Sequence, residues 1–164
     1  MRATTFLVLI GSLVLFQGAC SSKKETPPPP LNKELLMGKW KFPTGTLFLL
    51  GYEFGSDGTL KMKVQGIKQP ITCQYTWSGD RSVQVEYPKE AEVRQAYEAA
   101  AKTYKNKIEE DVKNSVMDAK IASGLINGLV ETLPDKETFT VGISDPRYLV
   151  LVRSGTPMNL EKDD

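Results

Sequence analysis

The feature that most restricts the fold is a change of hydrophobic period partway along the chain. In residues 71–77 apolar and polar side chains alternate one by one, which is typical of a β-strand with one buried face. The same period of two recurs in the segments 38–42, 60–64, 83–87 and 139–143. Between 88 and about 133 the apolar residues instead recur every three or four positions, which is typical of amphipathic helices. These patterns predict a mainly β domain with a helical segment inserted before its last strands.

Turn residues join the predicted strands into an antiparallel meander. Asp57-Gly58 is a strong signal for a tight hairpin between a strand over 46–54 and the strand over 60–64. A meander of this kind buries one face and leaves the other in water. Residues 156–161 are a candidate final edge strand. We therefore expect a small barrel or half-barrel.

The inserted segment is expected to form two helices. The first runs to about residue 119, and the second covers 121–133 and stops at Pro134. The apolar face of the first comprises Val93, Tyr97, Ala101, Tyr104, Ile108, Val112 and Val116. Two strands, over 47–50 and 148–153, are apolar on both faces and need cover on the outside. We expect the insertion to pack over them.

The first residues are predicted to direct export. Arg2 supplies a positive charge, residues 6–16 are uncharged, and polar residues begin at Gln17. This order is typical of a secretory signal peptide, and the apolar stretch is shorter than the ~20 residues of a bilayer-spanning helix. The segment Gln17-Gly18-Ala19-Cys20 resembles the lipobox of bacterial lipoproteins, with Gln17 in place of the usual Leu. The resemblance implies lipid attachment to Cys20; ordinary secretory cleavage is the competing interpretation.

The residues after Cys20 are expected to tether a folded domain to a membrane. Residues 20–37 begin with polar side chains, and the run Pro27–Pro30 favours a stiff polyproline II segment. In the lipoprotein family an Asp after the lipidated cysteine typically signals inner-membrane retention, so Ser21 implies the outer membrane, with the domain facing the periplasm. The predicted organisation is a signal peptide over 1–19, a lipidated tether over 20–37 and one domain over 38–164.

Composition narrows the chemistry open to this domain. The chain has 21 Lys and Arg against 20 Asp and Glu, and it contains no histidine. Because Arg2 leaves with the signal peptide, the mature chain is neutral, which disfavours nucleic acid as a partner. The missing histidine removes His-based catalysis and most zinc sites. Turn formation explains Asp57, Asp80 and Asp145. We predict no enzyme activity, no metal site and no cofactor.

Three features resemble the lipocalin-like (calycin-type) domains of exported bacterial proteins. Gly38-Lys39-Trp40 matches the G-x-W that opens the first strand, and residues 54–59 resemble the F-x-x-D-G-T hairpin. Arg153 matches the arginine that lies across the first-strand tryptophan. The resemblance covers 38–87 and 137–161, and it implies a barrel closed by a cation–π contact between Trp40 and Arg153. The alternative places Trp40 in the core and Arg153 on the surface.

Two functions remain open for the domain. The first is a non-catalytic binding module for a small hydrophobic ligand held inside the barrel. Its lining would be Phe54, Met62, Cys73, Tyr75, Trp77 and Phe139. Cys73, which has no disulfide partner once Cys20 carries lipid, is expected to be buried and unreactive. The second is a structural or interaction lipoprotein with a filled core, which binds an envelope protein through the helix over 88–119. The aromatic content slightly favours a filled barrel.

Overall fold

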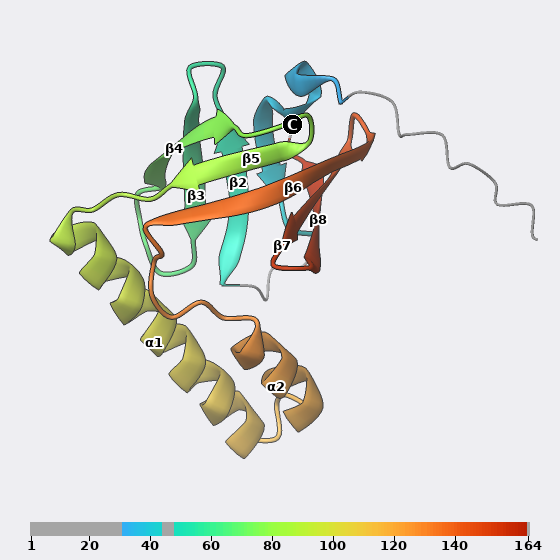
Figure 1. Ribbon diagram of the computed structural model, residues 1–164. Coiled ribbons are helices and arrows are strands. Elements are labelled where there is room, and N and C mark those ends of the chain that lie inside the picture. The colour runs from blue at the N-terminus through green and yellow to red at the C-terminus, as the bar shows by residue number, and fades with distance from the viewer. Residues whose placement is uncertain (1–30, 44–47, 164) are drawn as a thin grey trace, which may run out of the picture.

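A closed antiparallel barrel forms the body of the protein (Figure 1). The computed structural model describes residues 31–43 and 48–163, with the backbone alone for 143–145, so the expected signal peptide and Cys20 lie outside the described residues. The strands are β1 (Gly38–Lys41), β2 (Leu49–Phe54), β3 (Thr59–Val64), β4 (Ile71–Trp77), β5 (Ser82–Glu86), β6 (Lys136–Asp145), β7 (Tyr148–Arg153) and β8 (Thr156–Lys162). Each strand pairs with the next, and β8 pairs with β1. The predicted barrel with a helical insertion is confirmed, and the barrel is closed.

The alternating pattern works as the sequence predicts. Along β4 the buried side chains alternate with exposed threonine and glutamine side chains. The hairpin between β2 and β3 turns at Gly58, whose φ of 81° favours glycine. The Asp57 carboxylate stabilises this turn, because it accepts hydrogen bonds from the backbone N–H (3.0 Å) and the hydroxyl (2.6 Å) of Thr59. Local side-chain chemistry therefore sets this hairpin.

The barrel closes through a short ladder between its first and last strands. Trp40 pairs with Lys162, and Lys41 pairs with Glu161. Beyond the ladder, the backbone N–H of Asp163 donates to the carbonyl of Lys39 (2.9 Å). Without this pairing β1 and β8 would be the two edge strands of the sheet, so the closure removes both free edges.

A 3-10 helix covers one end of the barrel. This helix, η1 (Lys33–Leu36), begins at Asn32, whose side chain accepts from the N–H of Glu34 (3.0 Å). Leu36 is fully buried, and its carbonyl accepts the indole N–H of Trp40 (2.7 Å). The expected tether extended to residue 37, but these last residues pack against the barrel.

Two helices connect β5 to β6. They are α1 (Ala91–Lys113) and α2 (Ala119–Asn127), both shorter than predicted. α1 stops early because the chain turns at Ser115, whose φ is 58°, and the N–H of Val116 donates to the carbonyl of Asp111 (2.8 Å). Asp118 then starts α2 by accepting from the N–H of Lys120 (2.8 Å). The buried residues of α1 all belong to its predicted apolar face: Tyr97, Ala101, Tyr104 and Ile108.

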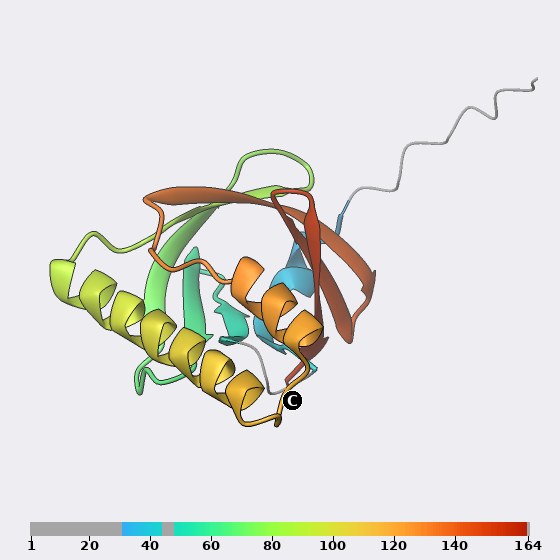
Figure 2. The same ribbon diagram turned by 90° about the horizontal axis from the view of Figure 1, so that it is seen from below.

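The helices lie across one end of the barrel, opposite η1, and not over the outer faces of β2 and β7 (Figures 1 and 2). On those outer faces Leu50 is 38% exposed, and Val150 and Val152 are half-buried. The expected packing over both strands is therefore wrong. The physical reason is connectivity: α1 follows the end of β5 and α2 precedes the start of β6, and these strand ends are paired neighbours at one rim. Within the described residues, no helix is long and apolar enough to cross a bilayer.

Candidate ligand-binding site

The residues predicted to line a ligand cavity inside the barrel form a packed core. Phe54, Met62, Cys73, Tyr75 and Phe139 are buried, and Trp77 is half-buried. The rings of Phe54 and Tyr75 meet edge to face, with centroids 5.3 Å apart. The Tyr75 hydroxyl donates to the carbonyl of Gly55 (2.7 Å). None of the six residues lines either of the two described cavities.

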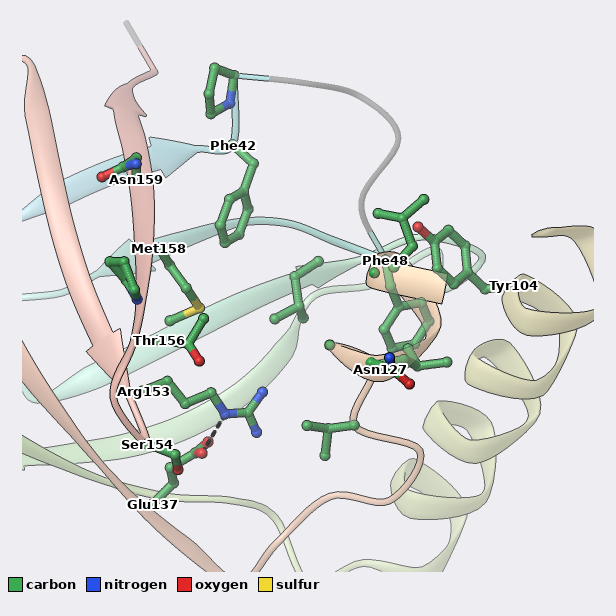
Figure 3. Close-up of a pocket in the computed structure, with 18 of the residues that line it drawn as sticks. Phe42, Phe48, Tyr104, Asn127, Glu137, Arg153, Ser154, Thr156, Met158 and Asn159 are labelled. Atoms are coloured by element: carbon green, nitrogen blue, oxygen red, sulfur yellow. Dashed lines mark hydrogen bonds and ion pairs between the residues drawn. The ribbon is translucent and has the colours of Figure 1, made fainter. Parts of the chain in front are cut away.

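The larger described cavity lies at the helix-covered end of the barrel (Figure 3). Its volume is about 660 Å³, which is within the range of small-molecule sites. Apolar side chains form most of the wall, among them Phe42, Phe48, Met158, Tyr97, Tyr104 and Leu125. The first three come from the barrel end and the last three from α1 and α2. The cavity is thus built between the barrel and the insertion.

An aromatic contact joins the two walls of the cavity. Phe48, just before β2, lies against α1, with ring centroids 5.2 Å from Tyr97 and 5.5 Å from Tyr104. The Tyr97 hydroxyl donates to the carbonyl of Val130 (2.9 Å), which ties α1 to the segment after α2. Aromatic pairs of this geometry contribute about 0.5–1.5 kcal/mol each beyond their burial.

Arg94 holds the base of the insertion. Its guanidinium donates to the carbonyls of Pro88 and Leu133, each at 2.9 Å, and to the carboxylate of Asp135 (2.7 Å). These partners lie on the two chain segments that enter and leave the insertion. One side chain therefore fixes where both connections cross the barrel rim, and so positions α1 above the cavity.

An ion pair between Glu137 and Arg153 lies in the cavity wall (Figure 3). Their side chains are only 13% and 18% exposed. Arg153 donates through Nε to Glu137 Oε1, and the hydroxyl of Tyr87 donates to Glu137 Oε2 (2.9 Å). A pair this buried is costly to desolvate, and removing one partner leaves an uncompensated charge. Glu137 and Arg153 therefore give the mostly apolar wall one charged, polar point.

The tyrosines around this pair and Arg153 itself have pKa values far above neutral pH. Burial raises the pKa of Tyr97 to about 12 and raises the pKa of Tyr52 and Tyr87 well above the ordinary tyrosine value. Burial lowers the pKa of Arg153, but the hydrogen bond and charge of Glu137 outweigh burial, and its pKa is raised. The three tyrosines are therefore neutral and Arg153 is charged under physiological conditions.

Lys162, and not Arg153, lies over the first-strand tryptophan. Its Nζ is 4.3 Å from the centroid of the Trp40 ring, at the end of the barrel covered by η1. Arg153 lies near the opposite end, where it precedes the β7–β8 turn and pairs with Glu137. The expected contact of Trp40 with Arg153 is corrected: the cation–π partner comes from β8, which pairs directly with Trp40.

The remaining sequence-predicted chemistry lies away from the cavity. Cys73 is a free, buried thiol, and burial raises its pKa to about 12. A thiol with so little thiolate at neutral pH is a poor nucleophile. In the described part of the chain, no group of three or more His, Cys, Asp or Glu residues is arranged to hold a metal ion.

The sequence reasoning missed the cavity and its ion pair. Glu137 sits at an inward position of β6, two residues from buried Phe139, where a carboxylate interrupts the apolar alternation. That interruption was the available signal. The low charge of the second predicted helix, which carries Leu125 and Ile126, was another, because an apolar helix must cover something.

Comparison with known proteins adds little. No family model matches the chain, and no curated protein matches it. Among solved structures, an uncharacterized protein from Bacteroides eggerthii is similar, at 16% sequence identity over 77% of this chain and 98% of that chain, with a TM-score of 0.40. This likeness carries no argument about function.

Proposed function

We propose that this protein is an exported lipoprotein whose lipocalin-like barrel is a non-catalytic binding module for a small amphiphilic molecule. The cavity at the helix-covered end of the barrel carries the proposal. It combines a volume of about 660 Å³ and a mostly apolar wall with one nearly buried ion pair, Glu137–Arg153. An apolar cavity with few, placed polar groups is the usual form of a small-molecule site.

The ligand site in this proposal differs from the one the alternation suggested. The barrel interior around Phe54, Tyr75 and Phe139 is filled by side chains, which favours a ligand at the barrel end. The exposed lining residues Asn127, Ser154 and Thr156 give the ligand access from solvent between α2 and the β7–β8 turn. The protein would therefore bind its ligand beneath the helices.

Anchoring is the second part of the proposal. The signal-like residues 1–19, the lipobox-like segment ending in Cys20 and the proline run after it support attachment to a membrane by lipid. Ser21 supports the outer membrane as its location. Several acyl chains on one cysteine anchor a domain stably, whereas a single acyl chain gives only marginal membrane binding.

The alternative is an interaction lipoprotein that binds an envelope protein through α1. That function needs an exposed apolar stripe on α1, but Tyr97, Tyr104 and Ile108 are buried. The large exposed apolar side chains of the insertion are Val116, in the turn between the helices, and Ile121, in the first turn of α2. This observation favours the binding module over the interaction lipoprotein.

Mass spectrometry tests both parts of the proposal. Under denaturing conditions, full-length protein from membranes should lack residues 1–19 and carry acyl mass at its N-terminal cysteine, and Cys20→Ser should abolish that mass. Under native conditions, the soluble chain from Lys23 to Asp164 should carry extra mass that denaturation releases. Bare polypeptide in the native spectrum, together with no binding of added apolar probes, would refute the binding module. An unmodified Cys20 would refute the anchoring.

A further inference from the structure

The guanidinium of Arg153 has a hydrogen-bonding edge that the protein does not use. Among the described residues, the hydrogen bond of Arg153 is the one from Nε to Glu137. Figure 3 shows its two terminal nitrogens pointing away from Glu137 and into the cavity. Each terminal nitrogen carries two N–H donors, and guanidinium has no acceptor. The side chain of Arg153 is only 18% exposed, so these donors are available chiefly to a molecule inside the cavity.

The acceptor side of the ion pair is already engaged. Glu137 Oε1 accepts from Arg153, and Oε2 accepts from the hydroxyl of Tyr87 (2.9 Å). The hydroxyl of Tyr97, which also faces this end of the barrel, donates to the carbonyl of Val130. Asn127 and Thr156, which also line the wall, are exposed, and the buried Tyr104 belongs to α1, on the other side of the cavity from Arg153 (Figure 3). In its deep part the cavity therefore offers a ligand donors from Arg153.

We infer that the cavity selects amphiphiles whose buried polar end is a hydrogen-bond acceptor, received by the two terminal nitrogens of Arg153. This inference rests on the proposed function and specifies its ligand class. The apolar body of the ligand lies against Phe48, Leu125 and Met158, and the head lies at the ion pair. Carboxylate, phosphate and carbonyl oxygens all have the required chemistry, whereas a donor-only head such as an ammonium does not.

Whether the ligand's head group is charged can be decided by comparing ligands with charged and neutral acceptor heads. Glu137 and Arg153 are the charged residues among those lining the cavity, so the wall is neutral as a pair. A charged oxyanion and a neutral carbonyl can both reach the same donors. The oxyanion makes the stronger hydrogen bond but also meets the field of Glu137. Probes with the same chain and different heads separate these two cases.

The experiment is calorimetric titration of the chain from Lys23 to Asp164, which contains every described strand and helix. The probes are decanoate, the methyl ketone of equal chain length and decylammonium. Decanoate, the ketone or both should bind about ten- to a hundredfold more tightly than decylammonium. Decanoate ahead of the ketone identifies a charged head group; a ketone equal to or ahead of decanoate identifies a neutral carbonyl.

Variants assign the preference to Arg153. Arg153→Gln should remove the preference for acceptor heads. Because it leaves the carboxylate of Glu137 without its cation, this variant should bind decylammonium at least as tightly as the parent does. Lys136→Gln is the matched control, because Lys136 is the preceding neighbour of Glu137 but is exposed and pairs with Glu86 at the surface. If Arg153→Gln does not fold, Glu137→Gln/Arg153→Gln removes both charges without leaving either one unpaired.

Two results would overturn the inference in distinguishable ways. Equal affinity for all three probes means that the cavity binds apolar chains without distinguishing their head groups. A preference that survives in the Arg153 variants means that Arg153 does not cause it. In either case the proposed function stands and the inference fails. Failure of every probe to bind, together with a bare native mass spectrum, removes the proposed function and the inference together.

Discussion

At the residue scale, the tyrosines around the Glu137–Arg153 pair link the stability of the barrel to pH. Tyr52, Tyr87 and Tyr97 are buried, and burial holds each of them in its neutral form. Tyr87 also donates to the carboxylate of Glu137, so ionisation there would place two negative charges together. The ion pair is thus surrounded by groups that resist deprotonation.

These tyrosines predict loss of stability at alkaline pH. Below about pH 10 they are protonated in both the folded and the unfolded chain, so their contribution is fully present. Above that pH the unfolded chain releases protons that the folded chain keeps, which favours unfolding by about 1.4 kcal/mol per pH unit for each tyrosine. For Tyr97 the loss continues to its folded pKa of about 12. Urea unfolding measured from about pH 8 to about pH 12 should show this decline.

A tyrosine variant isolates the effect from other groups that titrate at high pH. Tyr97→Phe removes one buried phenol, so its stability should fall less steeply with pH than that of the parent. Tyr148→Phe changes a tyrosine that is 47% exposed and serves as the control. Identical pH slopes for the parent and Tyr97→Phe would contradict the assignment.

At the element scale, the pairing of β1 with β2 depends on a glycine that the period-two pattern does not reveal. A Cβ at Gly51 would lie 2.2 Å from the carbonyl oxygen of Trp40, where no side chain fits. The register of β2 against β3 also shifts between Leu49 and Gly51, so the strand bends at this point. Phe48, next to this irregularity, lies against Tyr97 of α1.

Gly51→Ala is therefore expected to destabilise the barrel by about 1–3 kcal/mol, because the strands must separate to admit a methyl group. Gly142→Ala is a matched control in a strand, since its Cβ would meet the Val150 carbonyl oxygen at an ordinary 3.7 Å. Chemical denaturation of both variants measures the difference. Equal stabilities would mean that β1 and β2 adjust freely at Gly51.

At the scale of the whole molecule, the helical cover leaves the barrel and returns to it between two paired strands. β5 and β6 pair directly up to Glu86 and Lys136, and the N–H of Tyr87 donates to the carbonyl of Asp135 (3.0 Å). A two-residue turn can therefore join these strands in place of the insertion. Phe54, Tyr75 and Leu149 lie on strands of the barrel, whereas Tyr97 and Tyr104 of α1 and Ala122 of α2 add to the same core from the barrel end.

Replacing residues 88–134 with Asn-Gly should leave a folded barrel that does not bind the amphiphilic probes. The β-sheet signal in circular dichroism should remain, with lower thermal stability because Phe48 loses its contacts with Tyr97 and Tyr104. Binding of amphiphilic probes should disappear, because α1 and α2 form one wall of the cavity. Unchanged probe affinity would place the ligand elsewhere in the molecule.

The sequence by itself determined the elements that depend on local chemistry. Strict alternation predicted β4, Asp57-Gly58 predicted the β2–β3 hairpin, and spacings of three and four predicted the buried face of α1. Each of these follows from contacts between residues close in the chain. The fold class followed from the same patterns, because a meander of half-buried strands must close or be covered.

Only the tertiary structure decided which distant residues meet. The closure of β1 on β8, the position of Lys162 over Trp40 and the pairing of Arg153 with Glu137 all join segments that no local pattern connects. The helices lie across the barrel end because of where β5 ends and β6 begins. The cavity is the space left between the barrel and the helices, and the periodicity of a sequence does not predict the size or position of such a space.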